Sequence, residues 1–406
     1  MVAVPSTGPN IAVDLLRGGV RFCLGRPVLT LVALNLLATP LVYIPLYENR
    51  DGYLSISFSG FSMDNIYRRW DGPLYLVVAQ TFYDPGNPAV GAFSDLSPGY
   101  YAAHLPGYPA TIRLFSYIFG YANGMIAATI AATSLAIWVL YQLLKDLRLA
   151  GKAFWLGCVF LLLPPRWLIY HSVGAAEPLF IAEVLGFILF YRRKQFWLAG
   201  LAGAAAVLTR SPGVLLLGVY LALIGWEYLR SSPRPAVWSV AWQKLLPMAP
   251  FVAALLLLSA LFQVQYGDIF AYFHSGDNIH LTGAPFSSVW LSVLGYKWSE
   301  ATLWIYLLNA VGILLLWRNG RQDLALFAGA FYVPLIFVAH HDLVRYMLPI
   351  FPLTLIIGYE RLLGAREFKL AMLLIVPAIY VYTWSGVQTN LAPPEAMRQL
   401  LALAGG

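Results

Sequence analysis

Long apolar segments recur along this chain, and they decide what it can fold into. A transmembrane helix needs about 20 predominantly apolar residues, and most of these segments approach that length. Hydrophobic residues make up 60% of the 406 and charged residues only 11%, unlike a soluble domain. The sequence therefore predicts an all-α polytopic membrane protein with about eleven transmembrane helices. We place them at about residues 27–47, 123–144, 153–170, 174–191, 195–209, 213–229, 245–265, 300–317, 323–340, 344–362 and 368–386.

Basic residues indicate which side each loop faces. With the N-terminus inside, about 17 of the 26 Lys and Arg residues fall on inner loops, as the positive-inside bias requires. We therefore interpret the net charge of +7 as a topology signal and expect no nucleic-acid partner. Residues 1–25 are expected to form a cytoplasmic lead-in with an interfacial helix. The loop after the first span then lies outside, and residues 108–121, too short for a perpendicular span, predict a juxtamembrane helix in it.

The first outer loop holds an unusual group of residues, Arg68, Arg69, Trp70 and Asp71. The run that follows, residues 73–82, predicts a short amphipathic helix on the membrane surface. Asp71 stands just before its first turn, where an aspartate commonly caps free backbone N–H groups. Alternatively, Asp71 faces a pocket at the membrane boundary and acts as a general base or binds a polar ligand.

Several outer ends of the predicted spans carry further ionisable residues, each with two interpretations. Glu177 is either a favourable charge in the first turn of a helix or a partner for a sugar or an arginine. Glu183 lies deeper in the same span, where an ionisable residue is by default a site candidate or half of a buried pair. Arg210 either anchors the turn made by Pro212 and Gly213 or holds a phosphate bidentately.

The outer loop after residue 265 holds Asp268, His274, Asp277 and His280. Their spacing fits no known metal motif, so a sugar or acceptor cleft is favoured over a metal site. The adjacent His340 and His341 point to different sides of a helix and are a poor ligand pair. The sequence also has no glycine-rich nucleotide loop and no Asp-x-Asp motif, which favours a donor carried by a lipid over a soluble nucleotide sugar.

An ordered set of motifs resembles the GT-C membrane glycosyltransferases, which use polyprenyl-phosphate sugars. Within them the chain looks most like the PIG-V type, the second mannosyltransferase of GPI-anchor assembly, and its prokaryotic relatives. The matching pieces are Arg69-Trp70-Asp71 with Tyr75-Leu76 and Ala79, Leu105-Pro106-Gly107-Tyr108-Pro109, Glu177-Pro178-Leu179-Phe180, Thr209-Arg210-Ser211-Pro212-Gly213, Gln265-Tyr266-Gly267-Asp268, and Arg345-Tyr346 with Phe351-Pro352.

This resemblance implies a single GT-C domain over residues 1–406. Residues 1–266 would form the catalytic module, with juxtamembrane helices in the first outer loop at 48–122, and residues 267–406 would add variable C-terminal helices. It implies an inverting transfer in which Asp71 is the general base and Arg345 and Arg210 bind the donor phosphate. The expected substrate pocket comprises Arg69, Trp70, His104, His171, Glu177, Asp268, His274 and Tyr346. No metal cofactor is implied, although a divalent cation stays open.

The expected partners are a polyprenyl-phosphate sugar donor, with mannose as the sugar, a lipid or glycan acceptor, and membrane lipids. The chain contains no Asn-x-Ser/Thr sequon and ends without a retention signal, which favours a prokaryotic plasma membrane over an endoplasmic reticulum membrane. Two alternatives remain. One is a transporter or flippase for a lipid-linked or anionic substrate. The other is a non-catalytic lipid-binding subunit, which would tolerate Asp71→Asn.

Overall fold

The computed structural model describes residues 25–48, 56–58, 60–93, 95–276, 280–293, 299–340 and 342–404. Residues 1–24 of the expected lead-in lie outside this part of the chain, as do Asp277 and His341. The described residues are mostly helical, and their β-structure consists of isolated bridge residues, among them the pairs Arg69 with Leu391 and Leu281 with Val338. The expectation of an all-α polytopic membrane protein is therefore confirmed.

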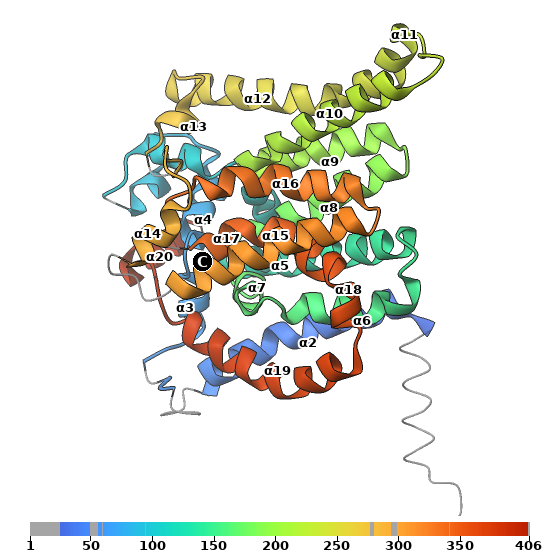
Figure 1. The fold of residues 1–406 in the computed structure, drawn as a ribbon. Coiled ribbons are helices and arrows are strands. Elements are labelled where there is room, and N and C mark those ends of the chain that lie inside the picture. The colour runs from blue at the N-terminus through green and yellow to red at the C-terminus, as the bar shows by residue number, and fades with distance from the viewer. Residues whose placement is uncertain are drawn as a thin grey trace, which may run out of the picture.

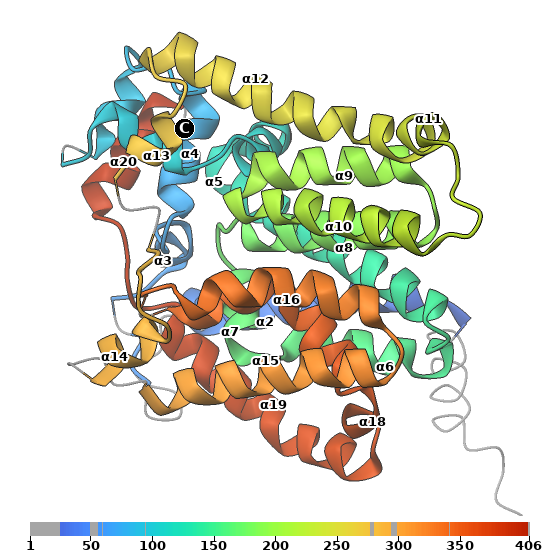
Figure 2. The ribbon, with the colours of Figure 1, turned by 45° about the horizontal axis from the view of Figure 1, so that its top comes forward.

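The long helices lie side by side in one bundle (Figures 1 and 2). Six described stretches are long and apolar enough to cross a membrane, namely Pro27–Tyr47, Gly107–Asp146, Ser211–Arg230, Val237–Tyr266, Glu300–Arg318 and Arg366–Gly386. Helix length alone does not test the predicted count of about eleven spans. The bundle helices are α2 (Pro27–Glu48), α5 (Gly107–Asp146), α6 (Ala150–Leu162), α8 (Glu177–Arg192), α9 (Phe196–Thr209), α10 (Val214–Arg230), α12 (Ala249–Tyr266), α15 (Ser299–Arg318), α16 (Gln322–Ile336) and α19 (Arg366–Gly386).

Helix α5 contains the predicted juxtamembrane helix. Its backbone leaves the helical conformation at Gly120, where φ is 71° and ψ is 168°. Glycine adopts this left-handed region without the steric cost of a Cβ atom. The kink separates a first part, residues 107–119, from the longer part that follows. Residues 108–121 are therefore not continuous with the next span. This agrees with the separate juxtamembrane helix that the sequence predicted.

Prolines interrupt two of the predicted spans. The predicted span at 153–170 is wrong as a single run, because α6 ends at Leu162 and a separate short helix, α7 (Pro165–Tyr170), follows. The span predicted at 344–362 is likewise divided into α17 (Leu343–Met347), η6 (Leu348–Ile350), η7 (Pro352–Gly358) and α18 (Glu360–Leu363). Proline lacks the backbone N–H that a regular helix needs, which explains the break before α7 and the irregular helical turns around Pro349 and Pro352.

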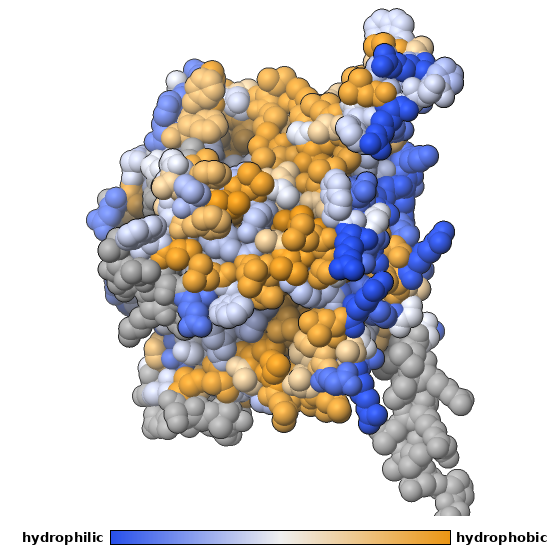
Figure 3. Space-filling view, in the orientation of Figure 1, coloured by the Kyte–Doolittle hydropathy of each residue, from blue (hydrophilic) through white to orange (hydrophobic). Residues whose placement is uncertain are grey.

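Short elements gather at one end of the bundle, on the left in Figure 1. They are α3 (Met63–Tyr67), α4 (Gly72–Thr81), η1 (Pro88–Ala92), η2 (Pro98–Ala103), α13 (Ala271–His274), α14 (Ser287–Val293) and α20 (Pro394–Leu403). At the opposite end, α5, α8, α10 and α15 each carry a basic residue in the last turn. Figure 3 shows this as dark blue at the right beside a largely orange flank. The basic helix ends thus gather at one end of the bundle, as expected for the predicted inner loops.

Helix α4 corresponds to the short helix predicted after Asp71, but its surroundings differ from the prediction. Most of its residues are buried, including Gly72, Pro73, Leu76 and Val77. It packs against α5, η1 and η2, and the C-terminal helix α20 also lies against it. The helix is therefore enclosed by the outer elements, whereas the sequence predicted an amphipathic helix with one face exposed.

Candidate functional site

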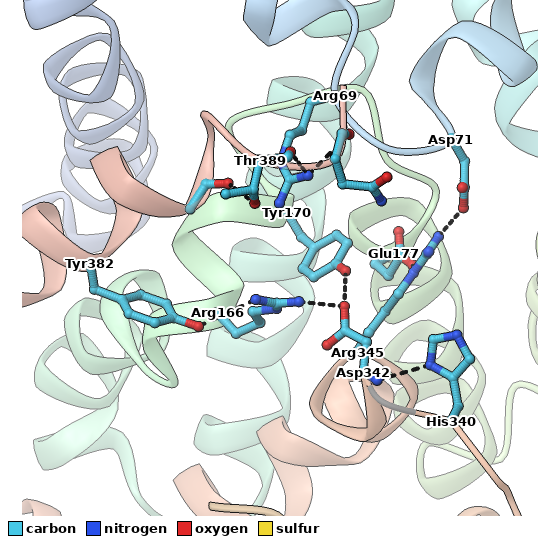
Figure 4. A network of polar contacts seen from close by, with 12 residues as sticks. Arg69, Asp71, Arg166, Tyr170, Glu177, His340, Asp342, Arg345, Tyr382 and Thr389 are labelled. Carbon is cyan, nitrogen blue, oxygen red and sulfur yellow. Dashed lines mark hydrogen bonds and ion pairs between the residues drawn. The ribbon is translucent and has the colours of Figure 1, made fainter. Parts of the chain in front are cut away.

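Asp71 occupies the N-cap position of α4, yet its side chain makes no capping hydrogen bond. Its carboxylate instead pairs with the Arg345 guanidinium, Nη2 to Oδ2 (Figure 4). The side chain keeps 32% of its surface exposed, so solvent reaches it. Of the two interpretations of Asp71, the structure therefore rules out a side-chain cap and leaves a carboxylate in a charged cluster.

Glu177 joins the two arginines that the sequence singled out. Its Oε1 accepts from Arg345 Nε at 2.5 Å and from Arg210 Nη1. The side chain of Glu177 is only 1% exposed, and those of Arg210 and Arg345 are 17% and 14% exposed. The partners come from the start of α8, the end of α9 and α17. A buried carboxylate is tolerated when opposite charges pair with it, so Glu177 holds both guanidinium groups in place.

The ion pairs set the protonation of Asp71. Burial on its own would raise the pKa of this carboxyl, but the charge of Arg345, with smaller contributions from His104 and Arg210, lowers it to about 2. The pKa of His104 is also lowered, to about 4, but the main cause is burial, and the ring is therefore neutral at pH 7. Its ring contacts Tyr75 edge to face at 5.0 Å. At neutral pH the pair Asp71 and Arg345 is therefore fully ionised beside a neutral imidazole.

A second polar cluster lies beside the first and was missed from the sequence. Asp342 accepts from Tyr170 Oη at 2.8 Å and from Arg166 Nη2 at 2.6 Å (Figure 4). The Tyr170 ring stacks on Trp70, with 3.9 Å between ring centroids. Arg166 could be noticed in the sequence only as an arginine at an outer helix end. Asp342 and Tyr170 carried no signal of their own, because their partners lie far away in the chain.

Trp70 is held by neighbours instead of being open to a ligand. Besides Tyr170, the Arg69 guanidinium carbon lies 3.8 Å from its ring centroid. Two groups this close to the ring centre leave little room for a sugar to stack there. Arg69 is 1% exposed and donates through Nη1 to the carbonyl oxygens of Thr389 and Asn390. Both residues were predicted for the substrate pocket, and in the structure they lie in the turn that precedes Asp71.

Two of the sequence motifs meet where α5 begins and α9 ends. A Cβ atom added at Gly107 would lie 2.3 Å from Thr209 Oγ1 and 3.0 Å from the Leu208 carbonyl group. Only glycine allows this approach, which keeps Arg210, the next residue, beside Glu177. Thr209 Oγ1 also donates to Glu183 Oε1 at 3.0 Å. The partner of Glu183, which the sequence did not show, is therefore a hydroxyl group.

The remaining predicted pocket residues have separate surroundings. His171 is fully buried, and its Nε2 lies 3.0 Å from the Leu161 carbonyl oxygen. His274 Nδ1 and Asp268 Oδ2 are 2.6 Å apart in a pair at the end of α12, and this pair lowers the pKa of Asp268. The Tyr346 ring lies 4.9 Å from that of His340. The structure thus brings Asp71, Glu177, Arg210 and Arg345 together and gives these other residues different partners.

No group of three or more His, Cys, Asp or Glu side chains in the described ranges is arranged to hold a metal ion.

Comparisons with known proteins identify a shared fold. No family model matches the chain, and no curated protein matches it significantly. Among solved structures it is similar to ArnT from Cupriavidus metallidurans, crystallised bound to undecaprenyl phosphate. The TM-score is 0.53 at 14% identity, over 93% of this chain and 76% of the other. At this identity the likeness shows the fold alone, and it confirms the predicted GT-C fold.

Proposed function

We propose that the protein is an inverting glycosyltransferase that moves a sugar, mannose, from a polyprenyl-phosphate donor to a hydroxyl group of a lipid or glycan acceptor. The observation that carries this is the ion-paired set Asp71, Arg345, Glu177 and Arg210 at the end of the bundle opposite the basic helix ends. A fold shared with a protein crystallised with undecaprenyl phosphate supports a polyprenyl-phosphate donor. Mannose rests on the PIG-V-type motifs.

The proposed reaction is a single displacement at the anomeric carbon. The acceptor oxygen attacks this carbon on the face opposite the phosphate, while the bond from the carbon to the phosphate oxygen breaks. Asp71 takes the proton of the acceptor hydroxyl, and the electron pair of the broken bond leaves with polyprenyl phosphate. Arg345 and Arg210 stabilise the negative charge that develops on this leaving group. The reaction as written includes no metal ion.

The observed pairing adds a condition to this mechanism. While Arg345 pairs with Asp71, the pKa of the carboxyl is about 2, which makes it a weak base. A donor phosphate that binds Arg345 competes with Asp71 for the same guanidinium group. Once Arg345 turns to the phosphate, Asp71 loses the neighbouring positive charge that lowers its pKa, and the pKa rises. Donor binding therefore produces the base, and we expect the donor to bind before the acceptor reacts.

Glu177 keeps the arginines in place during this exchange. It is almost completely buried and binds Arg345 through Nε, whereas Asp71 binds through Nη2 and is one-third exposed. The two carboxylates thus use different donor atoms of one guanidinium group. Asp71 can be released while the contact with Glu177 persists. The proposed site faces the outside of a prokaryotic plasma membrane, or the lumen if the membrane is that of the endoplasmic reticulum.

The test is sugar transfer from synthetic polyprenyl-phosphate mannose to candidate lipid acceptors by the purified protein in detergent. General-base catalysis contributes about 10²- to 10⁴-fold, so we expect Asp71→Asn to lose turnover by that factor. Arg345→Ala should also weaken donor binding. Full turnover by the Asp71 variant would remove the mechanism. Donor binding without any transfer by the wild type would favour a lipid-binding subunit. Movement of the intact donor across a vesicle membrane, without transfer, would favour a flippase.

A further inference from the structure

The chain returns to the candidate site after its last long helix. Residues 387–403, here named the C-terminal strap, leave α19 and pass beside α3 and α4 before forming α20 (Figures 1 and 2). Sequence reasoning gave this segment no function. It contacts the turn that carries Arg69, Trp70 and Asp71, more than 300 positions away in the chain.

Backbone and side-chain hydrogen bonds join the strap to this turn. The Trp70 N–H donates to the Asn390 carbonyl oxygen at 3.1 Å, and the Ala392 N–H donates to the Arg68 carbonyl oxygen at 2.9 Å. In addition, Arg68 Nε donates to the Ala392 carbonyl oxygen at 2.7 Å. Arg69 forms an isolated antiparallel bridge with Leu391. The strap therefore acts as a short partner strand for residues 68–70.

The conformation of Trp70 needs such support. Its φ angle is 50°, in the left-handed region that is uncommon for a bulky residue. Residues in sparsely populated regions are strained and persist only where their surroundings hold them. Here the backbone bond to Asn390 and the packing of the ring between Arg69 and Tyr170 provide that hold. Because Asp71 is the next residue, the direction of its side chain depends on this conformation.

Arg69 is the side chain that links the turn to the strap. It is 1% exposed, and its Nη1 donates to two strap carbonyl oxygens, those of Thr389 and Asn390. Burial lowers the pKa of Arg69 to about 9, which still leaves it charged at pH 7. The charge thus lies between two strap carbonyls and the Trp70 ring face, an arrangement that stabilises a cation.

A second contact fastens the other end of the strap. Helix α20 buries Ala396, Met397 and Leu400 and packs on η1 and α4. Gln80, near the end of α4, donates through Nε2 to the Leu400 carbonyl oxygen at 3.3 Å. The strap is therefore attached both before Asp71 and along the helix that follows it.

We infer that the C-terminal strap, through Arg69, positions the Asp71 carboxylate for the transfer reaction. Arg69 is then a positioning residue, because it acts through Trp70 and does not touch the reacting atoms. The inference rests on the proposed function only where it is tested by sugar transfer. It predicts that loosening the strap slows the chemical step and leaves the donor-binding arginines, which Glu177 holds, in place.

The test compares Arg69→Gln, Arg69→Lys and a chain ending at residue 386 with the wild type. A misplacement of about 1 Å can cost about 100-fold in rate. We expect kcat to fall about 100-fold in Arg69→Gln and in the shortened chain, with the donor KM changed less than about threefold. Lysine keeps the charge but lacks the planar fork, so its kcat should lie in between. Arg398→Ala is the matched control, because Arg398 is exposed and pairs only with Glu395 in the described structure.

Hydrogen exchange gives a second measurement that does not need activity. In the variants, peptides covering residues 62–72 should exchange faster, while peptides from α8 and α9 keep the wild-type rate. If the shortened chain does not fold, the two Arg69 variants decide. Wild-type kcat and wild-type exchange in Arg69→Gln would overturn the inference. A wild type that transfers no sugar would instead refute the proposed function, and the exchange measurement would still test the strap.

Discussion

Replacing Asp71 by asparagine should strengthen donor binding, although it slows turnover by about 10²- to 10⁴-fold. In the structure the carboxylate competes with any incoming phosphate for Arg345. Asparagine has the same size and keeps an oxygen that accepts a hydrogen bond, but it lacks the charge. The Arg345 guanidinium then loses one of its two anionic partners and retains Glu177. A general base that only contacted the acceptor would give no such gain.

The size of the effect follows from the pKa of Asp71. Its decrease from 3.8 to about 2 corresponds to about 2.4 kcal/mol of net interaction with the charged form. Because the side chain is 32% exposed, solvent screens part of this interaction. We take about 1 kcal/mol of this as the gain in the binding free energy of the phosphate when asparagine replaces Asp71. This equals about a fivefold decrease in Kd.

The assay is titration of undecaprenyl phosphate, which carries no sugar to transfer, into the purified protein in nanodiscs. Asp64→Asn is the matched control, because Asp64 lies in the same loop but pairs with Arg68 and keeps 43% of its side chain exposed. We expect Kd to decrease in Asp71→Asn and to stay at the wild-type value in the control. Equal or weaker binding by Asp71→Asn would refute the idea that Asp71 and the phosphate share Arg345.

Three further predictions follow from the same contacts. The pH dependence of kcat reports the donor complex, and that of kcat/KM for the donor reports the free enzyme, in which the pKa of Asp71 is about 2. On the acid side, kcat should therefore fall at a higher pH than kcat/KM does. A fall of both at the same pH would contradict the exchange of Arg345. Glu177→Gln should destabilise the protein by about 3–5 kcal/mol in thermal unfolding, because it leaves two buried guanidinium groups undercompensated, whereas exposed Glu395→Gln should not. Gly107→Ala should lower the stability by about 1–3 kcal/mol through its clash with Thr209, and Gly99→Ala, with open space around it, is the control; equal melting temperatures would refute the packing argument.

The fold was predictable because its causes are local in the sequence. Apolar length decides where helices lie in a membrane, and basic residues decide which ends lie inside. The kink at Gly120 was foreseeable in outline, since residues 108–121 are too short to span. The division of the predicted span at 153–170 was missed although Pro164 and Pro165 stand inside it. We drew that span from its apolar residues and gave too little weight to the two prolines, which interrupt a regular helix.

The site was only partly predictable, because its pairings are distant in the chain. Asp71, Glu177 and Arg210 were singled out as charged residues near outer helix ends, and Arg345 was singled out by the family resemblance. Which carboxylate meets which arginine depends on how α8, α9 and α17 pack, and no single sequence records that. Arg69 shows a stricter limit, since its partners are the backbone carbonyls of Thr389 and Asn390. A carbonyl oxygen is present at every position and leaves no trace in the residue types.

The charges of the two clusters bear on what they can bind. Among their described residues, the guanidinium groups of Arg69, Arg166, Arg210 and Arg345 face the carboxylates of Asp71, Glu177 and Asp342, an excess of one positive charge. A phosphodiester donor carries one negative charge, and its binding would make the site neutral. After transfer the leaving phosphate can carry a second negative charge, while Asp71 has gained a proton. The loss of one carboxylate charge then offsets the new phosphate charge, so the site stays balanced through the proposed step, which is the condition under which buried ionic groups cost least.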